Sequence, residues 1–497
     1  MTGFWRTALA AALCLTLYAQ GSDAKAQANA VMLPPEAVRS DFDALYVQLE
    51  QAHYDLFAHR PRGDYDRFHA QLRSEIDEPM NSAAAALLFQ RFVAYGRVGH
   101  ARIDAPVQAF VADLAGGSRL LPLFIRVDEG RVVLTATADA DGRFPAGSEI
   151  LEINEHPAAD WLDRLEAYVS AERPYMAHAL MEQSFPVLLG FELGNIDGVD
   201  VRAITPTGQA VEGRIDAVTL AGRRAIAAAW PTPSPPREEP REFNMLPDGV
   251  GYLRPGPFHN LAAPAEGPQP SYSPVEFTDF IDGAFARLLE ANATDLIIDL
   301  RDNPGGDNSF SDLMVAWFAD RPFRFASRFS LKASAQTKAW YAKSAATEAP
   351  DAGLAALLAA EAAQPDGARY DYPLPLNPPR SEPRFHGRVH VLVNRHSYSN
   401  AASVAALIQD YGFGHVLGEE TADVPTTYAS VLYFDLPETG ITVTYPKSRI
   451  VRPNGDERLS GVVPDHALPR PPIGVKQDVM LDQAVALVRS GRTAPGP

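Results

Sequence analysis

The stretch from Arg388 to Tyr411 constrains the fold of this chain more than any other part of the sequence. It opens with an apolar run, Val389 to Val393, whose length and β-branched content are typical of a buried strand. A polar corner follows over residues 394–400, and apolar residues then recur at helical spacing. A strand, a tight corner and a helix can hold a hydroxyl at a helix N-terminus, where free N–H groups favour a developing oxyanion. Ser397 and Ser399 lie in this corner, and this stretch alone leaves helix capping and nucleophilic chemistry equally open.

Length and charge limit the class of protein. The 497 residues suggest about three domains by the usual domain size, and an apolar fraction of 46% is that of a globular protein. There are 44 Lys and Arg against 62 Asp and Glu, so the net charge is −18. Such an acidic chain is not expected to bind nucleic acid or an anionic membrane surface.

The N-terminus has the pattern of a secretory signal. Arg6 supplies the positive charge, and Ala8 to Tyr18 is an apolar run too short to span a bilayer. Small residues suited to cleavage follow between Ala24 and Ala28, so residues 1–28 are predicted to be a signal peptide. Cys14, the only cysteine, lies inside this segment, which excludes disulfides, thiol catalysis and cysteine-ligated metal in the mature protein. We expect a soluble periplasmic or secreted protein.

Residues 29–104 are predicted to form a helical module. Apolar residues recur at helical spacing in three successive segments up to about residue 96. Gly99 and His100 follow at the exit of this module. A lone histidine in such a place is either structural or catalytic, and what it meets in space decides between the two.

Residues 105–225 change character and are predicted to form a small α+β domain. Strand-like segments at 121–127, 132–137, 145–154, 199–204 and 211–218 surround one expected helix at 158–169. This order, with the phrase AGSEILEINEHP, resembles a PDZ-like module, a class that grips peptide C-termini by adding a strand to a sheet edge. A Pro-rich linker is expected at 226–240.

After this linker, residues 241–497 alternate between helix and strand patterns, which favours a parallel or mixed α/β core. The strand from Asp295 to Leu300 ends in a turn that contains Gly305 and Gly306. Consecutive glycines allow positive φ and close backbone approach, as N–H groups aimed at an anion require. The Ala-rich segment 335–364 is either a lid over a cleft or a helical excursion that faces solvent.

Five motifs occur in one order along this second half: DLIIDLRDNPGGDNS, VHVLVNRHSYSNAAS, GEET, FDLPETGITVTYP and GVVPDH. As a set they resemble the C-terminal processing peptidases, also called tail-specific proteases, which are related to the tricorn core protease. The resemblance covers about residues 36–490. It implies a crotonase/ClpP-like spiral α/β catalytic core that carries an N-terminal helical cap and a PDZ-like α+β domain.

Two catalytic arrangements exist in the family that the chain resembles. The tail-specific branch pairs its serine with a lysine, but Val424 stands at the matching position, and Ala402 replaces a family glutamate. Lys447 is a distant substitute, expected at the surface. The tricorn-like branch pairs serine with a histidine and a late glutamate, which match Ser399, His100 and Glu457.

The resemblance therefore implies Ser399 as nucleophile, His100 as general base and Glu457 as support for the histidine network or a substrate amine. The Asn400 N–H and a glycine of the Gly305–Gly306 pair would form the oxyanion hole. Gly99 departs from the tricorn-like pattern, where a serine precedes the histidine. No cofactor and no metal site are expected.

These observations together predict an exported serine peptidase that cleaves peptides or unfolded protein tails through an acyl-enzyme. Two alternatives remain: a non-catalytic ligand- or peptide-binding protein on the same scaffold, and a serine hydrolase that acts on esters. The sequence does not fix the natural substrate or the oligomeric state.

Overall fold

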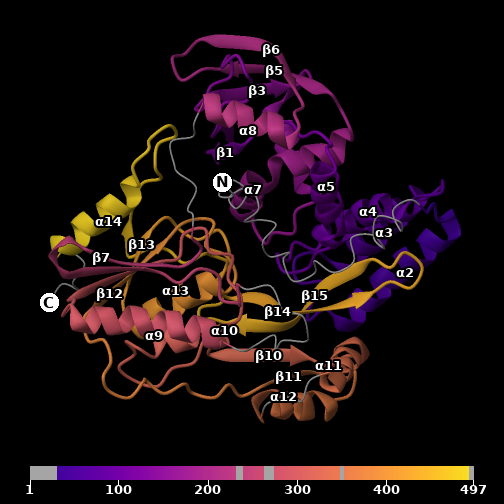
Figure 1. Ribbon diagram of the computed structural model, residues 1–497. Coiled ribbons are helices and arrows are strands. Elements are labelled where there is room, and N and C mark those ends of the chain that lie inside the picture. Colours follow the sequence, from indigo (N-terminus) through magenta and orange to yellow (C-terminus); the bar gives the residue numbers. More distant parts are fainter. Residues whose placement is uncertain (1–30, 231–238, 262–273, 348–351, 492–497) are drawn as a thin grey trace.

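The computed structural model describes residues 31–230, 239–261, 274–347 and 352–491. The expected signal peptide and the Pro-rich centre of the linker lie outside these residues. The described chain has a mixed α/β fold with three sheets, each with its own layer of helices (Figure 1).

The N-terminal module is helical, as predicted. Helices α2 (Pro35–Ala52), α3 (Arg62–Ser74) and α4 (Ser82–Tyr95) pack their apolar stripes together. Their shared core also contains residues of a distant β-hairpin, Phe434 and Tyr445 among them. The module is therefore a cap that shares its core with the second half of the chain.

The middle of the chain forms an antiparallel sheet in the order β1-β2-β3-β5-β6, with β4 on β3. Its strands are β1 (Ile125–Asp128), β2 (Arg131–Leu134), β3 (Glu149–Ile153), β4 (His156–Pro157), β5 (Gly198–Ile204) and β6 (Ala210–Asp216). The expected helix is α6 (Ala158–Glu166). Three further helices, α5 (Ala105–Ala115), α7 (Pro174–Leu193) and α8 (Leu220–Ala229), were not expected.

The C-terminal half is built on a sheet in the order β16-β13-β12-β9-β8-β7, parallel except for the β7 edge. Its strands are β7 (Glu242–Leu246), β8 (Val250–Arg254), β9 (Asp295–Asp299), β12 (Arg388–Val393), β13 (His415–Gly418) and β16 (His466–Ala467). Helices α9 (Val275–Glu290), α10 (Asn308–Val315) and α13 (Asn400–Tyr411) share the main core with this sheet, and α14 (Val479–Arg489) packs on a second, smaller cluster. Because apolar clusters lie on both sides of β9 and β12, these strands are apolar almost throughout.

A third sheet, β11-β10-β15-β14, joins the core to the cap. It contains β10 (Arg328–Lys332), β11 (Arg369–Asp371), β14 (Thr427–Asp435) and β15 (Thr442–Val451). The Ala-rich segment forms α11 (Ala335–Thr347) and α12 (Ala352–Ala362), and α11 lies against α2 and β14. The β14–β15 hairpin reaches out to the cap helices, as Figure 1 shows at the right of the view.

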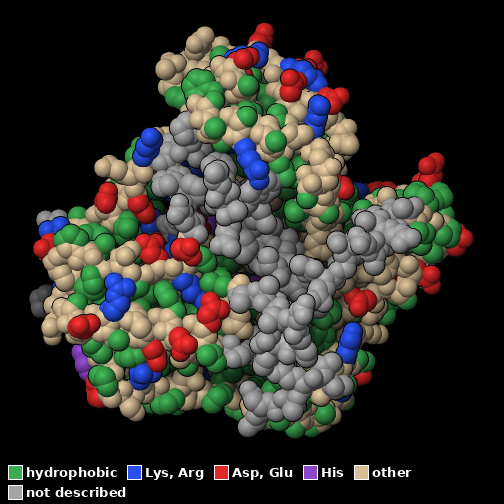
Figure 2. Space-filling view, viewed as in Figure 1, with side chains coloured by type: hydrophobic (Ala, Val, Ile, Leu, Met, Phe, Trp, Pro, Cys, Tyr) green, Lys and Arg blue, Asp and Glu red, His purple; other side chains and the backbone are tan. Residues whose placement is uncertain are grey.

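The surface mixes charges of both signs. Figure 2 shows acidic and basic side chains interspersed over the face in view. None of the described helices is long and apolar enough to cross a bilayer.

Candidate active site

His100 and Ser399 meet in space although 299 positions separate them in the sequence. The His100 Nε2 atom lies 3.2 Å from the Ser399 Oγ atom, which is hydrogen-bond distance. For Nε2 to accept the hydroxyl proton, the imidazole must carry its own proton on Nδ1. The structure thus brings together the two residues for which the resemblance implied the roles of base and nucleophile.

Backbone pairing to the core fixes the segment that carries His100. Arg102 forms an antiparallel bridge with Thr444 of β15, with N–H to carbonyl distances of 3.1 Å and 2.9 Å. The Tyr398 hydroxyl donates to the Gly99 carbonyl over 3.1 Å, and the His100 ring stacks on the Tyr398 ring at 5.5 Å. The residue before the nucleophile therefore holds the base from two sides.

Ser399 is the N-cap residue of α13, with φ 54° and ψ −124°, a region that residues with a side chain rarely adopt. Its side chain makes no capping hydrogen bond. Ser397 does not cap the helix either, because its hydroxyl donates to the Leu300 carbonyl over 2.7 Å. The capping interpretation is therefore wrong for both serines, and the Ser399 hydroxyl is free to face His100.

The two glycines after β9 lie directly against the nucleophile. A Cβ atom on Gly305 would stand 2.8 Å from the Ser399 Cβ and 2.7 Å from the Asn400 nitrogen, so no larger residue fits there. Gly305 and Gly306 have φ of 88° and 131°. The Gly305 N–H already donates to the Asn303 side chain over 2.9 Å. Within the described residues, no partner is found for the N–H groups of Gly306 and Asn400, which leaves these two for an oxyanion.

Burial sets the protonation state of the base. His100 is 5% exposed, and burial, with a smaller effect of the Arg102 charge, lowers the pKa of its imidazole to about 3. The ring is therefore neutral through the ordinary pH range, as a general base must be. The Nδ1 atom is buried and finds no hydrogen-bond partner in the part of the chain that the structure describes.

Two buried carboxylates lie beneath this pair. Asp423 accepts the backbone N–H groups of Ser399 and Val424, and burial raises its pKa to about 6 against the effect of these bonds. Glu172 accepts the Gly99 N–H over 3.1 Å, and burial, then the charge of Asp423, raises its pKa to about 8. Sequence patterns assigned no role to either residue, since nothing in the loop between α6 and α7 indicates which side chain points inward.

Glu457 lies elsewhere. Its carboxylate forms ion pairs with Arg328 at 2.7 Å and Arg449 at 2.6 Å, and 47% of its side chain is exposed. Among the described residues it makes no contact with His100 or Ser399.

Lys447 is not at the surface, so that expectation is wrong. Lys447 is 4% exposed, and its Nζ donates to the Ser430 hydroxyl over 2.7 Å. Val424, at the position of the missing lysine, is buried in the core.

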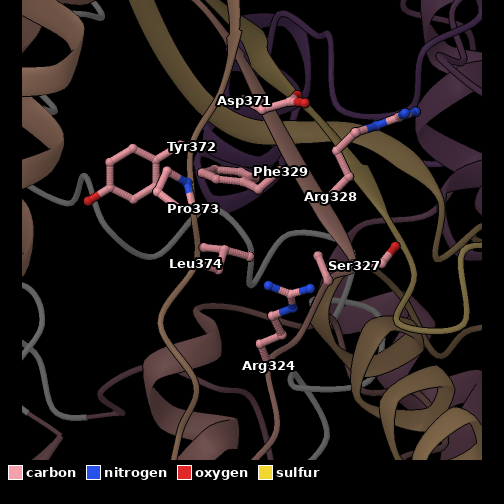
Figure 3. A pocket seen from close by; sticks show the side chains of 9 residues that line it. Arg324, Ser327, Arg328, Phe329, Asp371, Tyr372, Pro373 and Leu374 are labelled. Carbon is pink, nitrogen blue, oxygen red and sulfur yellow. The ribbon is translucent and has the colours of Figure 1, made fainter.

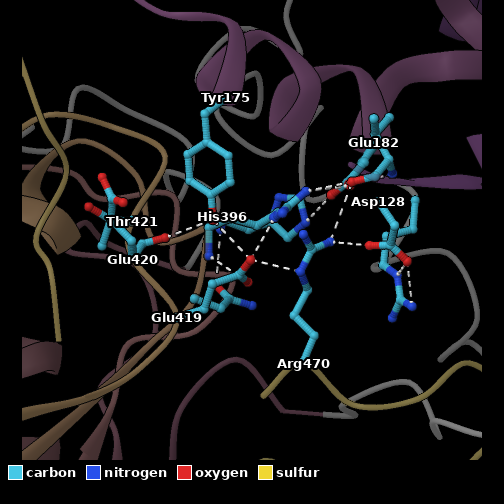
Figure 4. A network of polar contacts seen from close by, with 12 residues as sticks. Asp128, Tyr175, Glu182, His396, Glu419, Glu420, Thr421 and Arg470 are labelled. Carbon is cyan, nitrogen blue, oxygen red and sulfur yellow. Dashed lines mark hydrogen bonds and ion pairs between the residues drawn. The ribbon is translucent and has the colours of Figure 1, made fainter. Parts of the chain in front are cut away.

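A network of charges ties the catalytic corner to the middle domain (Figure 4). Arg395, four residues before the nucleophile, contacts Glu182 of α7 at 2.8 Å and Glu419 at 2.9 Å. His396 contacts the second oxygen of Glu182 at 3.0 Å. Arg470 joins Glu419 to Asp128 at the end of β1. The corner is thus held from the helix α7 side as well as from its own sheet.

Two cavities formed by described residues lie away from His100 and Ser399. One of about 180 Å³ is lined by residues of β10 and the segment after β11, with Arg324 and Tyr372 on its rim (Figure 3). Arg328, the ion-pair partner of Glu457, lines it, whereas His100 and Ser399 do not. No group of three or more His, Cys, Asp or Glu side chains suited to a metal ion is found in the described ranges.

Comparison with known proteins identifies the family. Residues 250–468 match the model of peptidase family S41. A structure of mature CPAF has a TM-score of 0.61 with 17% sequence identity, and the alignment covers 92% of this chain and 97% of that one. Mature CPAF complexed with lactacystin gives a TM-score of 0.57 with 16% identity, covering 92% and 98%. At such identities these structures show a shared fold only.

A comparison with curated protein sequences gives no match. The family match spans the nucleophile, both glycines and Glu457, whereas His100 lies outside it. It confirms the resemblance to the C-terminal processing peptidases that the motifs indicated. Residues 250–468 thus match peptidase family S41, and the chain is a serine-type peptidase.

Proposed function

We propose that this protein is an exported serine peptidase of the tricorn-like type, in which Ser399 is the nucleophile and His100 the general base. The observation that carries the proposal is the 3.2 Å contact between the Ser399 Oγ and the His100 Nε2. A serine hydroxyl is a poor nucleophile without a base within hydrogen-bond reach, and His100 is such a base.

In the proposed reaction the Ser399 Oγ attacks the carbonyl carbon of the scissile peptide bond, and its proton passes to His100 Nε2. The carbonyl oxygen becomes an oxyanion that accepts the N–H groups of Asn400 and Gly306. The imidazolium then returns the proton to the leaving amine, the C–N bond breaks, and an acyl-enzyme remains. A water molecule, activated by the same imidazole, releases the acid and restores the hydroxyl.

The proposed architecture is a crotonase/ClpP-like spiral core with an N-terminal helical cap and a PDZ-like domain. The strand order of the middle sheet and the single parallel sheet of the C-terminal half support it. Its proposed substrates are peptides or unfolded protein tails, which the strand-adding edge of a PDZ-like sheet would suit. Export rests on the signal pattern in residues 1–28.

The test compares Ser399→Ala and His100→Ala with the wild-type protein on a peptide library and with a fluorophosphonate probe. We expect Ser399→Ala to abolish both turnover and labelling, and His100→Ala to reduce both by about 10³-fold or more. Ser403→Ala, in the same helix, is the matched control and should react as the wild type does.

Each alternative gives a different outcome. A wild-type protein that takes up no probe at Ser399 would be a binding protein rather than an enzyme. A labelled protein that cleaves simple esters but no member of the peptide library would be an esterase. Full activity of Ser399→Ala would show that the nucleophile is another residue.

A further inference from the structure

Glu172 occupies a place beside the base that the proposed mechanism does not yet use. It lies in the loop between α6 and α7 and is 6% exposed. Its Oε1 atom accepts the backbone N–H of Gly99, the neighbour of His100, over 3.1 Å. A buried carboxylate is costly and is kept where a specific contact needs it.

Both residues of this cluster leave one buried polar atom unpaired. Among the described residues, the Glu172 Oε2 atom has no hydrogen-bond partner, and neither has the His100 Nδ1 atom. Nδ1 must carry the proton if Nε2 is to act as the base, so it is a donor without an acceptor. Glu172 has an acceptor oxygen without a donor, and its other oxygen is bonded to Gly99, the residue before His100. Buried polar groups are seldom left unpaired, which suggests that the two serve each other during the reaction.

Gly99 shows how closely the carboxylate approaches. A Cβ atom at Gly99 would lie 3.0 Å from the Glu172 Oε2 and 2.3 Å from the Met176 side chain. A side chain at position 99 would require the Met176 side chain to move and would press against the Glu172 carboxylate. The Tyr398 hydroxyl closes the other side, 3.4 Å from the same point.

The groups that face Glu172 come from three other segments. From β14, the Thr427 hydroxyl lies 3.5 Å from Oε1, and from the loop before β14 the buried Asp423 repels a charge on Glu172. The His100 segment contributes the Gly99 N–H and, further along, the Arg102 charge, which disfavours protonation of His100. The neighbouring Arg173 is directed at the Thr421 and Ala422 carbonyls and at Glu420, so it does not neutralise Glu172.

We propose that Glu172 is a positioning residue for His100, which holds the Gly99–His100 segment and, once ionised, stabilises the imidazolium form. This inference rests on the proposed role of His100 as the base. It implies that the reaction rate increases at alkaline pH. Neutral Glu172 only positions the Gly99–His100 segment, whereas ionised Glu172 also makes His100 a stronger base.

The test uses Glu172→Gln, which keeps an oxygen for the Gly99 N–H and cannot ionise. The matched control is Glu361→Gln, a buried glutamate that also accepts a backbone N–H, that of Ser334, over 3.2 Å. The measured quantity is the rate at which the fluorophosphonate labels Ser399, followed from about pH 6 to about pH 9.5.

We expect the wild-type rate to rise about tenfold through pH 8, the step at which Glu172 ionises, because stabilising the imidazolium by ~1.4 kcal/mol changes the rate by that factor. Glu361→Gln should show the same rise, and Glu172→Gln should not. If Glu172→Gln keeps the wild-type profile, the proposal is overturned, even if the variant has lost thermal stability.

A second readout separates this proposal from the proposed function. The carbon resonance of the His100 ring, identified by its absence in His100→Ala, is followed against pH by NMR. We expect it to shift as Glu172 ionises in the wild type and in Glu361→Gln, but not in Glu172→Gln. A protein that never labels at Ser399 would refute the peptidase mechanism, while this titration would still decide whether Glu172 acts on His100. An identical titration in Glu172→Gln and the wild type would overturn the role of Glu172.

Discussion

At the residue scale, the site depends on a few backbone positions that fit only one kind of residue. Ser399 has a strained φ of 54° that points its hydroxyl at His100 instead of at the helix N–H groups. Gly305 leaves room for Ser399, and Gly99 leaves room for Glu172. A serine before the histidine, as in the tricorn-like pattern, would require the Met176 side chain to move and would lie in tight contact with Glu172 here.

Glu457 remains a predicted member of the site, and its surroundings allow a clear test. Two arginines already neutralise it at the surface. If its contacts are purely structural, Glu457→Gln changes kcat/KM by less than about threefold, because exposed ion pairs contribute only ~0–1 kcal/mol. We expect this small effect in a peptide-cleavage assay. A loss of about 100-fold or more with an unchanged melting temperature would establish the catalytic role that the family resemblance implies.

At the element scale, the strand–corner–helix unit is the part that tertiary contacts hold most firmly. Arg395 has a 4% exposed side chain and contacts Glu182, Glu419 and the Val127 carbonyl. Its guanidinium also stacks on the Tyr175 ring at 4.7 Å. The corner of the core, helix α7 and strand β1 therefore form one electrostatic unit, in which a change to one partner reaches the nucleophile.

Removing that arginine should destabilise the protein strongly. Arg395→Leu removes the arginine from the buried Glu182 and the largely buried Glu419, which then keep only His396 and Arg470 as ion-pair partners among the described residues. Breaking a buried ion pair in this way costs about 3–5 kcal/mol. We expect a matching decrease in the free energy of unfolding, measured by urea denaturation with tryptophan fluorescence. The control is Arg458→Leu: that side chain is 82% exposed in its pair with Asp456, so its removal should change the free energy of unfolding only slightly. Equal losses in the two variants would contradict the argument.

At the scale of the whole molecule, the cap and the core are one cooperative structure at the active site. The cap helices share a core with the β14–β15 hairpin, and Arg102 pairs with β15 just beyond His100. His53, at the end of α2, is 1% exposed and accepts the Asp55 N–H at its Nδ1 atom. Two neutral histidines are thus buried in this shared region.

This burial predicts a loss of stability in acid. Burial, with a smaller effect of the Lys332 charge, lowers the pKa of His53 to about 3, and the pKa of His100 is lowered equally far. Both folded-state values lie below the unfolded value of about 6.5. Their stabilisation is therefore complete above pH 6.5 and decreases as the pH falls towards 3, by up to ~1.4 kcal/mol per pH unit for each histidine.

His53→Asn keeps an acceptor for the Asp55 N–H and cannot take up a proton. We expect it to flatten the fall in melting temperature between about pH 6.5 and pH 4, measured by calorimetry. The surface variant His386→Asn serves as control, since 61% of that side chain is exposed. A wild-type slope in His53→Asn would refute the prediction.

The sequence by itself predicted most of the elements of the core and cap and the two residues that meet at the candidate site. The buried strand β12, the helix α13, the glycine turn after β9 and the stripes of the cap follow from periodicity and from the backbone freedom of glycine, which are local properties. The motifs added the family and named Ser399 and His100, although nothing local joins residues 299 positions apart.

Only the tertiary structure decided which polar side chains surround that pair. Glu172 and Asp423 stand in loops without pattern, and their burial results from the packing of three segments around them. Lys447 was expected outside and is buried, whereas Glu457 was expected at the site and pairs with arginines at the surface. The physical reason is that the protonation and the partners of a charged group depend on its surroundings in space, and these are set by long-range packing that no local pattern records.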